Sequence, residues 1–180
     1  MHRDIAEVLF SEEAIRQRVR ELGRAISHDL AGREAVVMAL LKGSVLFFSD
    51  LVRSIDAPVK VEFAWASSYG KGTESSGEVL LKVFPEEDLR GRMVVVVDDI
   101  LDTGRTLSAV VDRLRNELGV TDVRTCVLLD KKARRTARIE ADYSGFPVDD
   151  VFVVGYGLDY ADRYRNLPYI GVLKPGCYGA

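Results

Sequence analysis

Apolar residues recur at three- and four-residue spacing in two stretches of the chain, a period that places them on one face of a helix. The first stretch starts at Ser11, a residue type that favours a helix start, and stops at Gly32. The second covers residues 106–118 and stops at Gly119. A third helix is expected over residues 45–54, where it would connect two strands.

Strands are predicted where apolar runs are short and bounded by turn residues. The runs at 35–41 and 93–97 are continuous, as in strands buried on both faces, and the second, the most hydrophobic, is expected at the centre of the sheet. Other predicted strands cover residues 59–63, 78–84, 123–129, 151–154 and 169–173. Because strands and helices alternate, we expect an α/β fold with a mostly parallel sheet flanked by helices and with ligands at the carboxyl ends of its strands.

Length and composition predict a single domain, residues 1–180, with 47% hydrophobic residues to form its core. The net charge of −3 comes from 25 Lys and Arg against 28 Asp and Glu, so no overall basic field favours nucleic acid or an anionic membrane as a partner. The longest apolar run, residues 35–41, is far shorter than the ~20 residues of a membrane-spanning helix, and we see no signal-peptide pattern. We therefore expect a cytoplasmic protein.

Candidate chemistry concentrates in residues 94–107, VVVVDDILDTGRTL, where a buried strand leads through two carboxylates and a short turn into a helix. Residues 103–106 would present amides and hydroxyls at the helix amino terminus, which favours a phosphate, and Gly104 would let the backbone approach closely. Asp98 and Asp99 would repel an anion, so ribose-type hydroxyls or a divalent cation suit them better. The alternative is an ordinary strand-to-helix turn with both carboxylates solvated.

As a whole, residues 94–107 resemble the phosphoribosyl pyrophosphate signature of the type I phosphoribosyltransferases. The resemblance implies the type I phosphoribosyltransferase fold, with a small hood formed by the amino-terminal segment and by residues of about 150–180. It implies that Asp98 and Asp99 bind the ribose hydroxyls and contribute to a Mg²⁺ site. The 5′-phosphate would lie against Asp102, Thr103, Gly104, Arg105 and Thr106. Asp102 is also placed to exchange a proton with N7 of a purine base, the second substrate of such an enzyme. The alternative role of Asp102 is to cap the helix.

The segment LKGS at residues 41–44 is similar to the family's pyrophosphate loop, in which a non-proline cis peptide commonly precedes the basic residue. The resemblance assigns Lys42, Gly43 and, much further along the chain, Arg165 to the pyrophosphate group. The alternative for this loop is a plain strand-to-helix turn with Lys42 in solvent.

The polar, glycine-rich stretch at residues 67–77, SSYGKGTESSG, is similar at its start to the family's catalytic lid. By that resemblance Ser68 and Tyr69 belong to a lid that closes over the pyrophosphate and excludes water from the reacting sugar. The alternative is the disordered tip of a hairpin.

Two further segments resemble the hypoxanthine-guanine branch of the family: LLDKK at 128–132 and DVFVVGYGLDY at 150–160. A lysine ammonium only donates hydrogen bonds, so Lys131 at the purine edge would bind O6 of hypoxanthine or guanine and not the 6-amino group of adenine. The resemblance also implies that Phe152 stacks on the purine, that the Val153 backbone contacts its pyrimidine edge and that Asp159 helps to hold Mg²⁺. The alternatives are a solvated basic face for Lys131 and a core position for Phe152.

Together these resemblances imply a Mg²⁺-dependent enzyme of purine salvage. It would transfer the phosphoribosyl group of phosphoribosyl pyrophosphate to hypoxanthine or guanine, giving IMP or GMP and pyrophosphate. The family suggests a homodimer or homotetramer. Three other functions remain open: a xanthine-preferring relative, an RNA-binding regulatory relative, which would need a basic face, and a phosphorylation-receiver domain, which has no use for the phosphate-binding turn.

Overall fold

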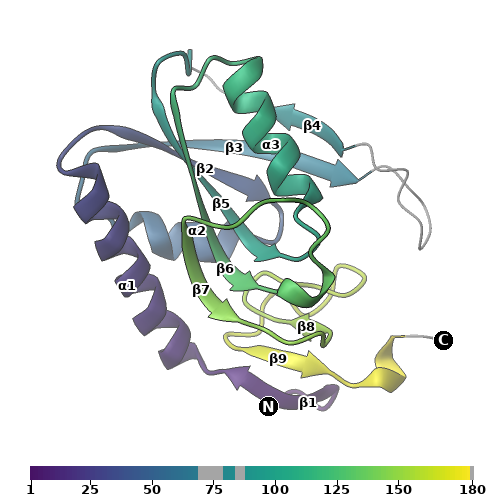
Figure 1. Ribbon diagram of the computed structural model, residues 1–180. Coiled ribbons are helices and arrows are strands. Elements are labelled where there is room, and N and C mark those ends of the chain that lie inside the picture. Colours follow the sequence, from purple (N-terminus) through teal and green to yellow (C-terminus); the bar gives the residue numbers. More distant parts are fainter. Residues whose placement is uncertain (69–78, 84–87, 179–180) are drawn as a thin grey trace.

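The computed structural model describes residues 1–68, 79–83 and 88–178, and its centre is a mostly parallel sheet (Figure 1). Within these residues the strands are, in order across the sheet, β4 (Val79–Val83), β3 (Val59–Ser68), β2 (Ala35–Leu41), β5 (Met93–Leu101), β6 (Asp122–Asp130) and β7 (Tyr143–Pro147). Neighbouring strands are parallel except β3 and β4, which run antiparallel. The expected α/β fold class is confirmed, and β5, the most hydrophobic strand, lies in the interior of the sheet.

Helices cover both faces of the sheet (Figure 1). The helices α1 (Glu12–Leu30) and α2 (Val45–Val52) pack on one face, and α3 (Arg105–Asn116) packs on the other. The first helix begins where the sequence predicts, because the Ser11 side chain accepts a hydrogen bond from the Ala14 amide at 3.2 Å. Alternate residues of β2 pack against the two helical layers, which explains its continuous apolar run. In the described part of the chain, no helix combines the length and the apolar character of a membrane span.

Strand β5 is longer than the sequence predicts. The apolar run ends at Val97, but β5 continues to Leu101 because it keeps pairing with β6, beginning with Asp98 opposite Val127. Its pairing with β2 stops at Val97, opposite Ala39. The acidic pair therefore lies within a strand rather than after one, at the point where β2 and β5 separate.

The chain leaves β2 and β5 in opposite directions. From β2 it continues through α2 to β3, and from β5 it continues through α3 to β6, on the other side of the sheet. Such a reversal opens a crevice at the carboxyl ends of the two strands, where α/β proteins bind ligands. The two segments predicted to bind phosphate groups, residues 41–44 and 103–106, follow these strands and flank the crevice.

A small antiparallel sheet forms the hood. Within the described residues its order is β1 (Ile5–Phe10), β9 (Ile170–Leu173) and β8 (Val153–Val154). The apolar runs at 151–154 and 169–173 predict strands, and the structure assigns both to this sheet rather than to the central one. Strands β1 and β7 are not predicted from the sequence.

Candidate active site

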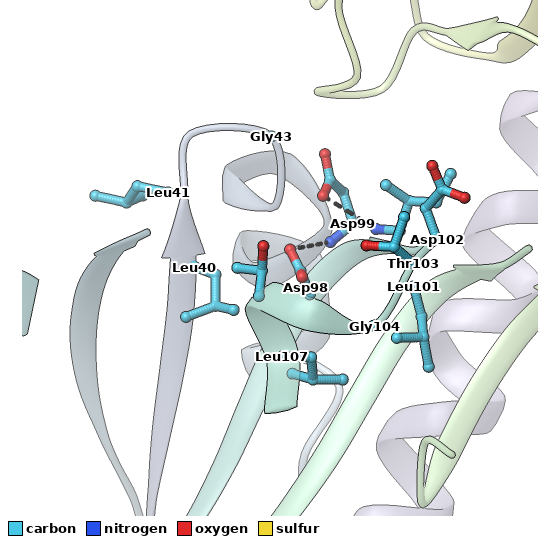
Figure 2. Close-up of a pocket in the computed structure, with 12 residues that line it drawn as sticks. Leu40, Leu41, Gly43, Asp98, Asp99, Leu101, Asp102, Thr103, Gly104 and Leu107 are labelled. Carbon is cyan, nitrogen blue, oxygen red and sulfur yellow. Dashed lines mark hydrogen bonds between the residues drawn. The ribbon is translucent and has the colours of Figure 1, made fainter. Parts of the chain in front are cut away.

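A pocket of about 270 Å³ lies at the carboxyl ends of β2 and β5 (Figure 2). Seven of the residues assigned from the sequence line it: Gly43, Asp98, Asp99, Asp102, Thr103, Gly104 and Thr106. The loop after β2, the end of β5 and the first turn of α3 therefore meet around one space. Arg105, assigned to the phosphate as well, is exposed at the start of α3 and is not part of this lining.

Asp98 and Asp99 bring two carboxylates to the pocket. The Asp99 amide donates to Asp98 Oδ1 and the Ile100 amide donates to Asp99 Oδ1, both at 3.0 Å (Figure 2). Burial raises the pKa of Asp98 well above its usual range, and the charge of Asp99 beside it raises that pKa further. Burial raises the pKa of Asp99 as well. Charge on this pair is therefore stabilised by added partners, such as hydroxyl donors or a divalent cation.

Gly43 leaves the space that the Asp99 carboxylate fills. A Cβ atom on Gly43 would collide with Asp99 Oδ2, so any side chain would displace the carboxylate. From the hood, Gly157 packs as closely on the other side, where its own Cβ would collide with the Gly43 carbonyl oxygen. The Leu41–Lys42 peptide just before Gly43 is cis, as the resemblance of this loop implies. The loop after β2 is thus held between β5 and the hood.

The turn before α3 has the features of an anion site. Gly104 has a φ of 81°, which favours glycine, and a Cβ atom here would lie 2.8 Å from Ile139 Cγ2. Glycine has no side chain to cap the helix. The Arg105 amide donates to Thr103 Oγ1 at 3.5 Å, and the amides that follow it in the first turn are left to other acceptors. Thr103 and Thr106 line the pocket on either side of this turn.

Asp102 lies in the pocket directly after β5 (Figure 2). Its Oδ2 is 3.5 Å from Arg134 Nη1. Its Oδ1 is buried and has no hydrogen-bond partner among the described residues. Because a buried acceptor without a hydrogen-bond donor costs free energy, a ligand group that donates a hydrogen bond would be stabilised at this oxygen.

Lys42 and Arg165, the two cations assigned to pyrophosphate, are brought to one carboxylate. Lys42 Nζ lies 3.8 Å and Arg165 Nη2 lies 3.1 Å from Asp162 Oδ1. Arg165 Nη2 also pairs with Asp159 Oδ1 at 2.9 Å, and Arg165 Nη1 donates to the Gly157 carbonyl at 2.8 Å. The hood therefore carries Arg165 to the loop after β2, where the Lys42 side chain is 56% exposed and has the Asp162 carboxylate as an ionic neighbour.

Lys131 is buried just after β6. Its Nζ pairs with Asp150 Oδ1 at 2.8 Å and donates to the Val151 carbonyl at 3.1 Å. These contacts fix the ammonium group beside the segment that leads to Phe152. Lys131 is therefore not part of a solvated basic face, although the next residue, Lys132, is exposed.

Phe152 belongs to an aromatic group in the hood. Its ring stacks on Tyr178 with ring centroids 4.7 Å apart, and it meets the edge of Tyr160 at 5.5 Å. Phe152 is partly buried and packs against the hydrophobic cluster of the hood, as in the alternative interpretation, while part of its ring stays accessible. Val153 follows as the first residue of β8, with its backbone opposite Val172 of β9.

Of the predicted lid residues, Ser68 is the last residue of β3 and lies opposite Val79 of β4. Tyr69 lies outside the described residues. Strand β3 therefore runs beyond the predicted range of 59–63 and takes in the first two residues of the polar stretch.

Comparison with known proteins decides the family. A family model described as the phosphoribosyl transferase domain matches residues 6–161, which include the whole lining of the pocket. The chain belongs to the phosphoribosyltransferase family. A hypoxanthine-guanine phosphoribosyltransferase of Bacillus subtilis is 45% identical to it over 178 residues, which are 99% of this chain and 98% of that protein.

Two further matches agree with this assignment to the phosphoribosyltransferases. The bifunctional protein TilS/HprT of Listeria monocytogenes is 49% identical over 178 residues, 99% of this chain, but the chain spans only 27% of that protein's length. A crystal structure of a hypoxanthine phosphoribosyltransferase from Staphylococcus aureus matches with a TM-score of 0.94 at 44% identity, covering 100% of this chain and 97% of that chain. The sheet and hood are thus the type I phosphoribosyltransferase fold.

One residue that supports the site of this phosphoribosyltransferase is not predicted from the sequence. The Arg135 guanidinium, only 10% exposed, donates to the carbonyls of Leu101 and Asp102 at 2.9 Å and pairs with Asp130. These contacts hold the backbone that leads into the phosphate turn. In the sequence Arg135 is one of several neighbouring basic residues, and no local pattern separates it from them.

Two acidic residues of the site are likewise missed. Asp150 holds Lys131, and Asp162 lies between Lys42 and Arg165. Asp150 is the first residue of the segment 150–160 that resembles the family, and Asp162 lies two residues after that segment. Both residues could have been identified by one signal, namely an acidic residue next to residues that are predicted to bind an anion or a purine.

A Mg²⁺ site is expected at Asp98, Asp99 and Asp159. Among the described residues, no group of three or more His, Cys, Asp or Glu side chains converges as a set of metal ligands. Asp159 is engaged by Arg165 and by the Asp162 amide, which donates to its Oδ2 at 2.8 Å. Asp98 and Asp99 would be the residues to hold a Mg²⁺ ion together with substrate oxygens and water, because this cation is usually bound through one or two carboxylates.

Proposed function

We propose that this phosphoribosyltransferase transfers the phosphoribosyl group of phosphoribosyl pyrophosphate to hypoxanthine or guanine, giving IMP or GMP and pyrophosphate, with Mg²⁺ as cofactor. The observation that carries the proposal is a pair of carboxylates of raised pKa beside a helix amino terminus in one pocket. Hydroxyls suit the first feature and a phosphate suits the second. A ribose 5-phosphate carries both groups in a single molecule.

The donor would bind across the separation of β2 and β5. Asp98 and Asp99 accept hydrogen bonds from the ribose hydroxyls, and these bonds stabilise the charged carboxylates. The amides of the first turn of α3 and the hydroxyls of Thr103 and Thr106 bind the 5′-phosphate. Arg135 keeps this turn in place through the two carbonyls before it.

The pyrophosphate leaving group would bind between the loop after β2 and the hood, where Lys42 and Arg165 lie. Lys42 and Arg165 bind the departing pyrophosphate by charge-assisted hydrogen bonds. Mg²⁺, when bound, neutralises part of the charge that develops on the diphosphate. Asp102 accepts the proton of N7 of the purine as another ring nitrogen attacks the anomeric carbon and the bond from that carbon to pyrophosphate breaks. Its buried Oδ1 is the oxygen available for this step.

Lys131 supports the choice of base. An ammonium group has three N–H donors, of which two are directed to Asp150 and to the Val151 carbonyl. The third can donate to O6 of hypoxanthine or guanine, whereas the 6-amino group of adenine offers no acceptor there. The names of the Bacillus subtilis and Staphylococcus aureus relatives agree with this choice.

We also propose that the enzyme is a homodimer or homotetramer. Alternate residues of β3, namely Val61, Phe63 and Trp65, expose large apolar side chains. Phe63 meets the edge of Phe48 of α2 with ring centroids 5.4 Å apart, so this stripe lies on the α2 side of the sheet. The exposed Val45 and Leu46 of α2 add to it, and the result is an apolar face suited to a second copy of the chain.

The test of the proposed reaction is direct. The protein is incubated with phosphoribosyl pyrophosphate, Mg²⁺ and, separately, hypoxanthine, guanine, xanthine or adenine, and nucleotide formation is followed. We expect IMP and GMP to form and the adenine reaction to be negligible. A preference for xanthine would replace the proposed substrate within the same family, and no nucleotide from any base would contradict the proposal.

A further inference from the structure

Residues 160–163 form a tight turn in the hood. Its third residue, Asp162, lies beside the cations assigned to pyrophosphate. Tyr160 and Arg163 exchange backbone hydrogen bonds at 3.2 and 3.0 Å, and the two residues between them, Ala161 and Asp162, have φ of 50° and 58°. Positive φ at both central positions is the pattern of a type I′ turn, which favours glycine and asparagine. Aspartate tolerates a positive φ better than most residues with a side chain, whereas alanine does not, so the strain of this turn lies at Ala161.

The Asp162 carboxylate joins two parts of the molecule. Its Oδ1 lies 3.1 Å from Arg165 Nη2, in the hood, and 3.8 Å from Lys42 Nζ, in the loop after β2. The hydrogen bond from Arg165 and the charge of Lys42 lower the pKa of Asp162, so the carboxylate is charged at neutral pH. The side chain is nevertheless 74% exposed, which leaves it room to move into solvent.

We propose that Asp162 is an internal competitor for pyrophosphate, which occupies Lys42 and Arg165 in the substrate-free enzyme and returns to them as the diphosphate leaves. The inference rests on the proposed function, which assigns these two cations to that group. A carboxylate oxygen and a diphosphate oxygen are both anionic acceptors, so they compete for the same donors. A site that is open in only a fraction of the molecules binds its ligand more weakly by that fraction, and product release becomes easier.

Two variants separate competition from a structural role. Asp162→Asn keeps the size of the side chain, suits a positive φ and removes the charge. Asp162→Gly removes the charge together with the side chain and relieves the backbone. The matched control is Asp56→Asn, because Asp56 is an exposed acid just before β3. It lies at the amino ends of the parallel strands, whereas the pocket lies at their carboxyl ends.

The measurement is calorimetric titration of the full chain with inorganic pyrophosphate in the presence of Mg²⁺. For both Asp162 variants we expect Kd to fall roughly three- to tenfold, the range that one or two exposed ion pairs represent. Asp56→Asn should keep the original Kd. High salt screens exposed charges, so the gain should shrink as ionic strength rises.

The outcomes divide cleanly. Unchanged or weaker binding in both Asp162 variants overturns the inference, and weaker binding would mean that Asp162 positions the cations instead of competing for them. If the unaltered protein does not bind pyrophosphate, the proposed function fails and the inference fails with it. Binding by the unaltered protein without a gain in the variants removes the inference alone.

Discussion

Among the carboxylates of the pocket, Asp102 has one oxygen near Arg134 and one buried oxygen that lacks a partner among the described residues. Replacement by asparagine keeps the shape of this side chain and removes its basicity. We therefore expect Asp102→Asn to lower kcat by about 10²–10⁴-fold, the usual contribution of a positioned acid or base, with little change in Tm. Steady-state kinetics and thermal unfolding check this. Turnover close to that of the unaltered enzyme would remove Asp102 from the proton transfer.

Lys131 and Lys132 form a matched pair, one buried and one exposed. We expect Lys131→Ala to raise the KM for guanine by about tenfold or more, because it removes a charged donor to O6, while the KM for phosphoribosyl pyrophosphate changes little. Lys132→Ala should leave both values near the original. Equal losses for the two substrates in Lys131→Ala would contradict a role confined to the base.

The sequence identifies the residues assigned to substrate contacts better than the residues that hold them. Asp98 and Asp102 stand in one contiguous signature whose chemistry follows from residue type and order. Arg135 and Asp150 become informative only when the fold brings them to Leu101 and Lys131. Their contacts depend on the parallel arrangement of β5 and β6 and on the segment after β7, which no local pattern specifies.

At the scale of elements, the continuation of β5 past its partner β2 places Asp98 in a buried environment, where ionising the carboxylate costs free energy. The pKa of Asp98 is raised in the folded protein, whereas an unfolded aspartate titrates near ~3.9. Between these two pKa values the folded state binds more protons than the unfolded state, so the free energy of unfolding falls as pH rises. Above the raised pKa, the charged carboxylate is a net cost to the substrate-free protein.

Asp98→Asn should therefore stabilise the substrate-free protein while abolishing its use of the donor. Each 1 kcal/mol gained at pH 8 corresponds to about 2–4 °C in Tm for a domain of this size. The gain should be smaller at pH 5, where the original carboxylate is more often protonated. Thermal unfolding at the two pH values checks the sign, and a Tm that falls at pH 8 would contradict it.

The contact between the loop after β2 and β5 gives a second prediction at this scale. A Cβ atom on Gly43 would collide with Asp99 Oδ2, so Gly43→Ala must move either the loop or the carboxylate. We expect the KM for phosphoribosyl pyrophosphate to rise about tenfold or more, since overpacking typically costs 1–3 kcal/mol. Gly176→Ala is the control, because nothing lies within 4 Å of an added Cβ there. Equal KM values for both variants would argue against the packing role of Gly43.

Strand β7 shows why some elements are not visible in the sequence. Its residues, YSGFP, include a glycine and a proline, which normally argue against a strand. Gly145 is needed because a Cβ atom there would collide with the Leu128 carbonyl of β6. At this edge Arg18 of α1 donates to the carbonyls of Ser144 and Gly145 at 2.8 Å. The strand is therefore stabilised by contacts from distant parts of the chain.

For the whole molecule, the apolar stripe on β3 predicts self-association. We expect Val61→Glu to shift the protein from a dimer or tetramer toward the 20.0 kDa mass of one chain, because it puts a charge into the proposed interface. The control is Val8→Glu, an exposed valine on β1 of the hood. Size-exclusion chromatography with light scattering measures both masses. An unaltered protein that already has the mass of one chain would contradict the proposed assembly.

The central claim is that a sugar phosphate lies where β2 and β5 separate, and a crystal structure of the protein with bound GMP tests it most directly. The expected result has the ribose hydroxyls within hydrogen-bond distance of Asp98 and Asp99 and the 5′-phosphate on the amides of residues 103–106. A nucleotide bound elsewhere, with this pocket holding only water, would contradict the claim.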